Sequence, residues 1–397
     1  MGLQGINYLA PLLVWPYLMV VLDAGQFGVF SFGVALAQYL MLLVDFGFNL
    51  TATKQIALAK GNKEWTDRIF SSTMYAKFLL LAVSAVIMAG LSAVPRFAVY
   101  RKVMWIMWGM VTGHTFSMFW LYQGVGKVRL VAIVNACMKL LIMPLTFILV
   151  RSGDDVAIAA WIQVAVYIGA GCVTTVLTKT MGLASWVKVS WSDVAVQLRS
   201  SSPIFLSNAA TSTYTALFVV ILGCFVTSDE VGKYAAAEKI MRAACYLIWI
   251  PVCQAYFPKV SRLGQTNPSE GENLVRRLTL LLAVCLGVAG VLLFFFAEPI
   301  AGLLGKNYAG LGKLSAIMAV VPVLVGVGGA QGQFGLIALG GKKEKRSFRN
   351  VYFAAGAVAL VSVCWFAYFW GVSGAAYALV LTEGTVCVSM TVLNKRR

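Results

Sequence analysis

Long apolar stretches separated by short polar segments run through the whole chain. A membrane helix needs about 20 predominantly apolar residues, and each stretch approaches or exceeds that length. About twelve stretches qualify: 3–22, 28–53, 69–93, 98–122, 129–150, 156–178, 202–226, 231–257, 274–296, 312–338, 350–370 and 374–393. The pattern therefore predicts an all-α polytopic membrane protein with about 12 transmembrane helices.

The composition agrees with this pattern. Of the 397 residues, 60% are hydrophobic and only 12% are charged, whereas about 25% of the residues of a typical soluble domain are charged. An ordinary soluble domain is therefore excluded. We expect no cleavable signal peptide, because no charged segment precedes the first apolar stretch. The eight cysteines lie within the predicted spans without a Cys-x-x-Cys pair, so we interpret them as packing residues.

The net charge of +17 is explained by topology and not by nucleic-acid binding. If both termini lie on one side, most lysines and arginines fall on that same side of the membrane. The other side receives Arg96, Arg101, Lys102, Arg151, Lys306 and Lys313. Because cytoplasmic loops carry an excess of basic residues, both termini are predicted to be cytoplasmic.

The stretch 231–257 carries three charges inside a predicted span: Glu238, Lys239 and Arg242. Each costs roughly 2.5 to 3.5 kcal/mol near the middle of a membrane helix, so each needs a partner. Glu238 and Arg242 are four residues apart and can pair on one helix face. Lys239 points about 100° away from Glu238, which favours an anionic ligand as its partner. The alternative is an internal ion pair with a lysine that extends to the interface.

Two further lysines, Lys77 and Lys139, lie inside the predicted spans 69–93 and 129–150. Together with Lys239 and Arg242 they form a predicted cationic ladder across the membrane, which would bind an anionic substrate. Positive charges act more strongly on an anion in a low-dielectric site than in water. The hypothesis requires all four side chains to face one lumen.

Three acids also fall inside spans: Asp45, Glu238 and Glu383. They are our candidates for coupling transport to an ion, and a structural ion pair is the alternative for each. His114 is the only histidine, and no carboxylate or cysteine cluster accompanies it in the sequence. It is interpreted either as a packed polar residue or as a proton carrier, and no metal site or cofactor is predicted.

The polar segment 182–201 divides the chain into two halves. Residues 1–181 form a predicted N-terminal six-helix half, 182–201 a cytoplasmic interfacial linker that includes a helix, and 202–397 a C-terminal six-helix half. An internal echo supports the division. Phe27-Gly-x-Phe30 and Val231-Gly-x-Tyr234 each open the second span of a half, as expected for two parallel repeats.

Several short blocks resemble a known family in their order and spacing. They are Gln4-Gly-Ile-Asn-Tyr8 with Pro11 and Pro16-Tyr17, Phe27-Gly-Val-Phe30, Asp45-Phe-Gly-Phe-Asn49, Trp120-Leu-Tyr-Gln-Gly124 and Gly232-Lys-Tyr-Ala-Ala-Ala-Glu-Lys-Ile240. Over nearly the whole chain, these blocks are similar to those of the Wzx-type polysaccharide (O-antigen) flippases. That family is part of the multidrug/oligosaccharidyl-lipid/polysaccharide exporter superfamily.

The resemblance implies a V-shaped exporter fold and a transporter, not an enzyme. Its implied substrate is an undecaprenyl-diphosphate-linked oligosaccharide, an O-antigen or other surface polysaccharide repeat unit, moved across the bacterial inner membrane by ion-coupled alternating access. Membrane lipid is an expected partner, and a polysaccharide polymerase and a chain-length regulator are candidate protein partners. No nucleic-acid partner and no cofactor are expected.

Two rival functions stay open. A membrane polysaccharide polymerase or ligase needs a catalytic region on the outer face, but the longest external connection, 297–311, is short and poor in acid-base groups. A multidrug-type exporter of the same superfamily would favour acids in its lumen for cationic drugs. The cations Lys77, Lys139, Lys239 and Arg242 favour an anionic substrate instead.

Overall fold

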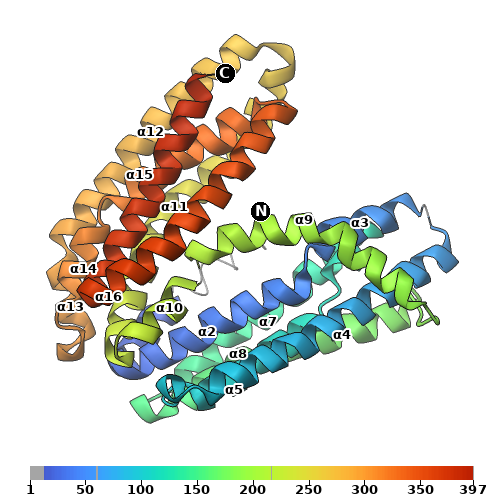
Figure 1. Cartoon of the computed structure of the whole chain (residues 1–397), viewed down its shortest axis with the longest axis horizontal. Helices are drawn as coiled ribbons and strands as arrows, with labels where there is room; N and C mark the ends of the chain where they lie inside the picture. Colours follow the sequence, from blue (N-terminus) through green and yellow to red (C-terminus); the bar gives the residue numbers. More distant parts are fainter. Residues whose placement is uncertain (1–12, 60, 216, 397) are drawn as a thin grey trace. The chain divides into compact units, whose positions relative to one another are not determined.

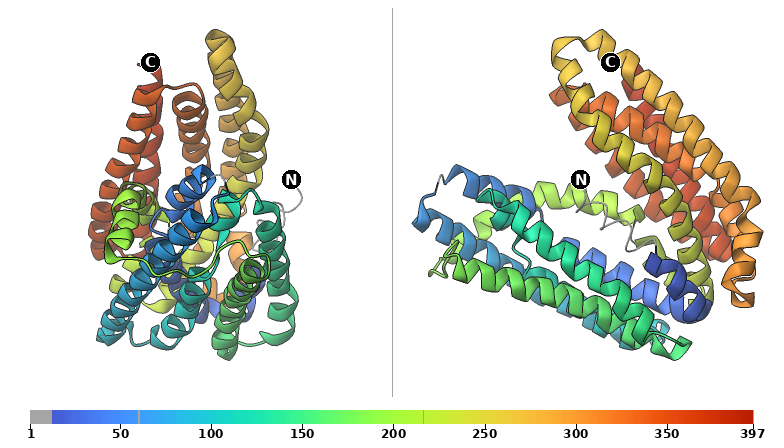
Figure 2. Two further views of the ribbon diagram at one scale, coloured as in Figure 1. Left: turned by 90° about the vertical axis from the view of Figure 1, so that its right-hand side faces the viewer. Right: turned by 180° about the vertical axis from the view of Figure 1, so that it is seen from behind.

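The computed structural model describes residues 13–59, 61–215 and 217–396. Within these ranges every regular element is a helix. The chain divides into two compact units, Met1–Ala209 and Ala210–Arg397, and each is a bundle of long helices (Figures 1 and 2). The prediction of an all-α fold is thus confirmed. The resemblance block at residues 4–8 and Pro11 lie outside the described residues.

In the first unit, residues 13–21 are helical. Seven further helices and the start of an eighth follow in its described part. They are α2 (Asp23–Asp45), α3 (Phe48–Leu58), α4 (Lys63–Ala93), α5 (Arg101–Thr115), α6 (Phe119–Gly124), α7 (Val128–Leu149), α8 (Val156–Thr180) and α9 (Trp191–Thr215). Two short 3-10 turns, Pro95–Phe97 and Gly153–Asp155, connect neighbouring helices. The last residues of α9 belong to the second unit.

The second unit continues with long helices. They are α10 (Leu217–Phe225), α11 (Ser228–Thr266), α12 (Pro268–Phe295), α13 (Ala297–Leu304), α14 (Leu311–Met318), α15 (Val321–Gly329), the π-helix η4 (Ala330–Ala338) and α16 (Lys342–Lys395). At Gly371 the backbone of α16 leaves the helical region, with φ 55° and ψ −134°. A positive φ favours glycine, so α16 consists of two helical segments that meet at this residue.

Eight helices in the described ranges are long and apolar enough to cross a membrane. The difference from the predicted number has local causes. The predicted span 98–122 is divided between α5, of 15 residues, and the short α6. The predicted span 202–226 is divided between α9 and α10, with residue 216 outside the described ranges. The predicted spans 350–370 and 374–393 are joined as α16, and the first predicted span lies partly outside the described residues. The protein is a multi-pass membrane protein, and twelve crossings stay a prediction.

Glycines set the closest helix contact of the first unit, where α5 crosses α8. A Cβ atom added at Gly113 would lie 2.5 Å from the backbone nitrogen of Ile168, and one added at Gly171 would lie 2.5 Å from the carbonyl oxygen of Gly113. Neither position has room for a side chain. Such small residues let membrane helices approach backbone to backbone, and this contact positions the end of α5, which carries His114.

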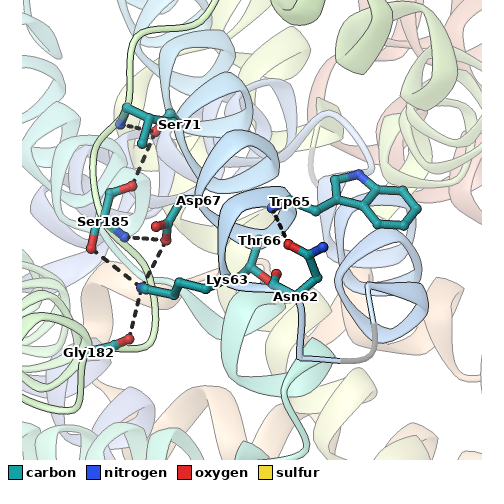
Figure 3. Close-up of polar contacts among 9 residues, drawn as sticks. Asn62, Lys63, Trp65, Thr66, Asp67, Ser71, Gly182 and Ser185 are labelled. Atoms are coloured by element: carbon teal, nitrogen blue, oxygen red, sulfur yellow. Dashed lines mark hydrogen bonds and ion pairs between the residues drawn. The ribbon is translucent and has the colours of Figure 1, made fainter.

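The connection from α8 to α9 is held against the first turns of α4 (Figure 3). The backbone N–H of Ser185 donates to Asp67 Oδ1 at 2.7 Å, and the N–H of Val187 donates to Ser71 Oγ at 2.9 Å. Lys63 Nζ lies 2.9 Å from Asp67 Oδ1 and donates to the carbonyl oxygen of Gly182. These side chains satisfy backbone groups that a helix would satisfy internally.

The interfacial helix expected within 182–201 therefore begins only at Trp191, since residues 183–190 are not helical. Near the start of this helix, Arg68 Nη2 donates to Asp193 Oδ1 at 2.9 Å. The Arg68 guanidinium and the N–H of Ser190 hold the pKa of Asp193 below its ordinary value. Asp193 is thus charged at neutral pH, and it anchors this end of α9 to α4.

Replacing Gly113 by alanine is expected to separate α5 from α8 and to destabilise the protein by about 1 to 3 kcal/mol, the usual cost of overpacking. The fraction of detergent-solubilised protein that stays monodisperse after heating measures this. Gly90→Ala in α4 is the matched control, because a Cβ at Gly90 meets nothing within 4 Å. Equal heat resistance of the Gly113→Ala and Gly90→Ala variants would contradict the packing argument.

Candidate functional site

The first candidate site is built at a break between α2 and α3. Phe46 and Gly47 follow Asp45 with φ values of 41° and 87°, so the chain ends α2 in the left-handed region. A Cβ at Gly47 would lie 2.9 Å from the side chain of Ile204 on α9, so space as well as conformation requires glycine. Phe46 stacks on Phe205, with ring centroids 4.4 Å apart. The break thereby fixes the direction of the Asp45 carboxylate.

Asp45 is the centre of a polar cluster inside the first unit. His114 Nε2, from the end of α5, lies 2.8 Å from Asp45 Oδ2. Lys77 Nζ, from α4, lies 3.5 Å from Asp45 Oδ1. Asn49 Nδ2, from the first turn of α3, donates to Asp45 Oδ2 at 3.0 Å. Four separate helices therefore bring one acid, one lysine, one histidine and one amide together.

The side chains of this cluster are largely shielded from solvent, which strengthens the interactions between their charges. The Lys77 side chain is fully buried and those of Asp45 and His114 are 19% and 25% exposed. Lys77 Nζ makes no hydrogen bond of good geometry within the described part of the chain, so the Asp45 carboxylate is what compensates its charge. With neutral His114 the cluster has no net charge, and a proton on His114 or Asp45 makes it +1. The charge of Lys77 is therefore compensated only while Asp45 is ionised.

The second candidate site lies on α11 and α16 in the other unit. Arg242 Nε donates to Glu238 Oε1 at 2.8 Å, which confirms the pairing predicted from their spacing. Glu383, 6% exposed, interacts electrostatically with Arg242 and Glu238. Lys239 is half-buried and also interacts with Glu238 and Arg242. Two acids and two cations are thus gathered in one place.

Two donors of this second cluster are buried without a hydrogen-bond acceptor among the described residues. They are Arg242 Nη2 and the hydroxyl of Tyr234, which lies two turns before Arg242 on α11. A buried donor that finds no partner costs about 1 to 3 kcal/mol. The second cluster therefore has unused capacity to donate to an anionic or polar group.

The predicted site residues are distributed unequally. Asp45 and Lys77 meet in the first unit, and Glu238, Lys239, Arg242 and Glu383 meet in the second. Lys139 lies alone on α7, half-buried and without an ion pair in the ranges that the structure covers. The common lumen of the cationic ladder stays a prediction. Nowhere in these ranges are three His, Cys, Asp or Glu side chains placed to hold a metal ion.

Three contributors were not among the predicted site residues: His114, Asn49 and Tyr234. His114 had been left between a packing and a proton-carrying role, and the structure places it on Asp45. The available signal was depth: with cytoplasmic termini, Asp45, Lys77 and His114 lie in the cytoplasmic halves of the predicted spans 28–53, 69–93 and 98–122. For Asn49 the signal was its spacing of four residues from Asp45 within one resemblance block. Tyr234 belongs to the internal echo and to the resemblance block 232–240, but neither pattern indicated a role for its hydroxyl.

The structure also explains two other resemblance blocks. In the block from Trp120 to Gly124, Trp120 and Tyr122 are fully buried, and the Tyr122 hydroxyl donates to the carbonyl oxygen of Thr174 on α8. A Cβ at Gly124 would lie 2.8 Å from the Ile56 side chain, so α6 packs closely on α3. In the block from Gly232 to Ile240, the first turns are buried within the second unit. These blocks thus have packing roles.

Solved structures of transporters share this fold. The lipid II flippase MurJ in an inward closed conformation superposes with a TM-score of 0.76 at 12% sequence identity, covering 98% of this chain and 86% of that one. An inward-facing multidrug resistance MATE family transporter of the MOP superfamily gives a TM-score of 0.70 at 14% identity, covering 98% of both chains. At these identities the likeness establishes the fold alone.

Sequence relatives add the family. A protein of Escherichia coli K12, provisionally named as an O-antigen transporter, is 29% identical over 96% of this chain and 91% of its own length. A protein of Shigella dysenteriae with the same name is 30% identical over 98% of this chain and 96% of its own length. The polysaccharide biosynthesis protein family matches residues 1–264. These relatives indicate a transporter and not an enzyme. The chain belongs to the polysaccharide biosynthesis protein family.

Proposed function

We propose that this protein is a flippase that moves an undecaprenyl-diphosphate-linked oligosaccharide across the bacterial inner membrane, with both termini in the cytoplasm. The O-antigen transporter relatives support a surface polysaccharide repeat unit as the glycan. The observation that carries the proposal is the buried Arg242, whose Nη2 donor has no acceptor among the described residues. A diphosphate is an acceptor of the size and charge that such a donor binds.

The cations have a defined task in this proposal. Lys139, Lys239 and Arg242 attract the diphosphate away from water, and Lys77 joins them when Asp45 no longer compensates its charge. Each is within a span, where the low dielectric strengthens its attraction for an anion. Binding must stay moderate, because the substrate has to leave on the outer side. The glutamates beside Arg242 keep binding moderate, because they compete with the diphosphate for the Arg242 guanidinium group.

Ion coupling is the second part of the proposal, with Asp45, Glu238 and Glu383 as the coupling groups. Protonation of Asp45 removes the partner of Lys77, and protonation of Glu238 or Glu383 frees more of Arg242. Protonation of these acids therefore releases cations from their ion pairs, and deprotonation restores the pairs. A proton thus shifts the protein towards the conformation that binds it better, which couples the charge state of the site to alternating access.

A multidrug-type exporter of the same superfamily is the second candidate, because a MATE family transporter shares the fold. Such an exporter would bind cationic compounds. The described charges favour an anion, since the acids Asp45 and Glu238 are already paired with Lys77 and Arg242.

Arg242→Gln and Lys139→Gln are expected to abolish or strongly reduce export in a flippase-null Gram-negative strain that makes the matching repeat unit. Surface polysaccharide should fall, and the lipid-linked repeat unit should accumulate on the cytoplasmic side at normal protein abundance. Lys102→Gln is the charge-matched control, because Lys102 is exposed at the start of α5. The double variant Glu238→Gln/Arg242→Gln removes both charges of the ion pair. If it also fails to export, the defect of Arg242→Gln comes from lost substrate binding and not from leaving Glu238 buried without a partner.

Wild-type export by both Arg242→Gln and Lys139→Gln would refute the cationic binding site while leaving the flippase function intact. If flipped single repeat units already appear without the protein, and only chain length depends on it, the flippase function itself is refuted.

Asp45→Asn is expected to lower protein abundance, because it leaves Lys77 buried and unpaired, a change that costs about 3 to 5 kcal/mol. The Asp45→Asn/Lys77→Met double variant removes both charges and should restore abundance. If Asp45 couples transport to protons, this double variant should still fail to export. Immunoblotting of membranes and surface glycan staining measure the two effects separately. Normal export by the double variant would make Asp45 and Lys77 a structural ion pair only.

A further inference from the structure

A pocket with a volume of about 240 Å³ lies in the second unit, away from the Arg242 cluster along the chain. Its lining comes from the start of α12, from η4 and from the end of α16. The residues are Glu272, Val275, Arg276, Gln331, Leu339, Asn394 and Lys395. Five of these seven side chains are polar or charged, and the charged ones lie at the start of α12 and the end of α16.

The π-helix η4 contributes Gln331 to this pocket, and Leu339 directly follows the helix. Its wide turn is visible in the bond from the N–H of Leu339 to the carbonyl oxygen of Phe334, five residues earlier. Gln331 in this helix donates to Thr279 Oγ1 at 3.2 Å and accepts a hydrogen bond from Asn394 Nδ2. A Cβ at Gly335 would lie 2.6 Å from Asn394 Oδ1, so this glycine makes room for the amide. Single π-turns are often found at functional sites.

The charges of the pocket are unbalanced. Arg276 and Lys395 are both exposed and neither has an ion pair within the described ranges, although Glu272 lines the same pocket. The pocket therefore carries two cations and one acid. Exposed basic residues at the start of α16 add to the positive field: Lys342, Lys343, Lys345, Arg346 and Arg349. An arginine fork and a lysine together are well suited to the oxygens of a phosphate group.

Apolar surface leads from this pocket along α12. Leu280, Val284 and Val288 follow Arg276 at successive intervals of four residues, and they are 60%, 64% and 55% exposed. Residues four apart neighbour each other on a helix, so the stripe begins at the Arg276 side chain and continues away from the pocket. A ligand with a phosphate at one end and a long apolar tail would contact both the pocket and the stripe.

We propose that this pocket binds the headgroup phosphate of an anionic phospholipid, with Arg276 and Lys395 on the phosphate and the acyl chains along Leu280, Val284 and Val288. The carboxylate of Glu272 accepts hydrogen bonds from headgroup hydroxyls such as those of phosphatidylglycerol. This lipid site is separate from the transport site, and it does not depend on the proposed flippase function.

The test uses the full-length purified protein and native mass spectrometry, which counts bound lipid molecules as phosphatidylglycerol is titrated in detergent. The Arg276→Gln/Lys395→Gln variant should bind phosphatidylglycerol more weakly, by roughly fivefold for each charge removed. Arg277→Gln/Arg396→Gln is the matched control, since it removes the same two charges from the neighbouring exposed residues, which do not line the pocket. Arg276→Lys keeps the charge and should lose much less affinity.

Two further titrations test whether the ligand is an anionic phospholipid, a neutral phospholipid or free phosphate. Phosphatidylethanolamine, with no net charge, should bind more weakly than phosphatidylglycerol, and inorganic phosphate should displace little of the bound lipid. Equal losses in the pocket variant and the control variant would overturn the proposal in favour of general electrostatic attraction. Efficient displacement by inorganic phosphate, or equal binding of the two lipids, would also overturn it. The measurement contains no glycan, so its outcome is independent of the flippase function.

Discussion

A charge inside a membrane must have a partner, and this constraint explains how the polar side chains of both units are arranged. Lys77 is completely buried, and Asp45 alone among the described residues compensates it. Arg242 likewise lies against Glu238. Since removing one member of a buried pair costs about 3 to 5 kcal/mol, the Lys77–Asp45 pair ties α4 to α2, while Glu238 and Arg242 stabilise each other within α11. The charges are therefore part of the packing as well as candidates for transport.

Irregular backbone is what brings these groups together. The left-handed turn at Phe46 and Gly47 places Asp45 and Asn49 on one cluster although they belong to different helices. Gly371 divides α16, so that Glu383 lies on a segment separate from the basic start of that helix. The π-helix η4 aims Gln331 at Asn394. In a membrane, such breaks occur where protein or water replaces the missing backbone partners.

Local features were predictable from the sequence and distant contacts were not. Glu238 and Arg242 pair because a helix puts residues four apart on one face, and the gap between 370 and 374 correctly indicated a break within the α16 sequence. The Asp45, Lys77 and His114 cluster joins helices far apart in the chain, so only their similar predicted depth hinted at it. The sequence did not indicate where the helix within 182–201 begins, because the non-helical conformation of residues 183–190 depends on contacts with the distant Asp67 and Ser71.

The two charge clusters are not equivalent, and the difference follows from how their donors are satisfied. In the first, one carboxylate accepts from an amide, contacts a histidine nitrogen and compensates the charge of a lysine. In the second, Arg242 has two glutamates nearby and still leaves Nη2 without an acceptor. A guanidinium with an open donor can bind a further acceptor. Lys77 in the first cluster is thus compensated by Asp45, while Arg242 in the second cluster keeps one donor available.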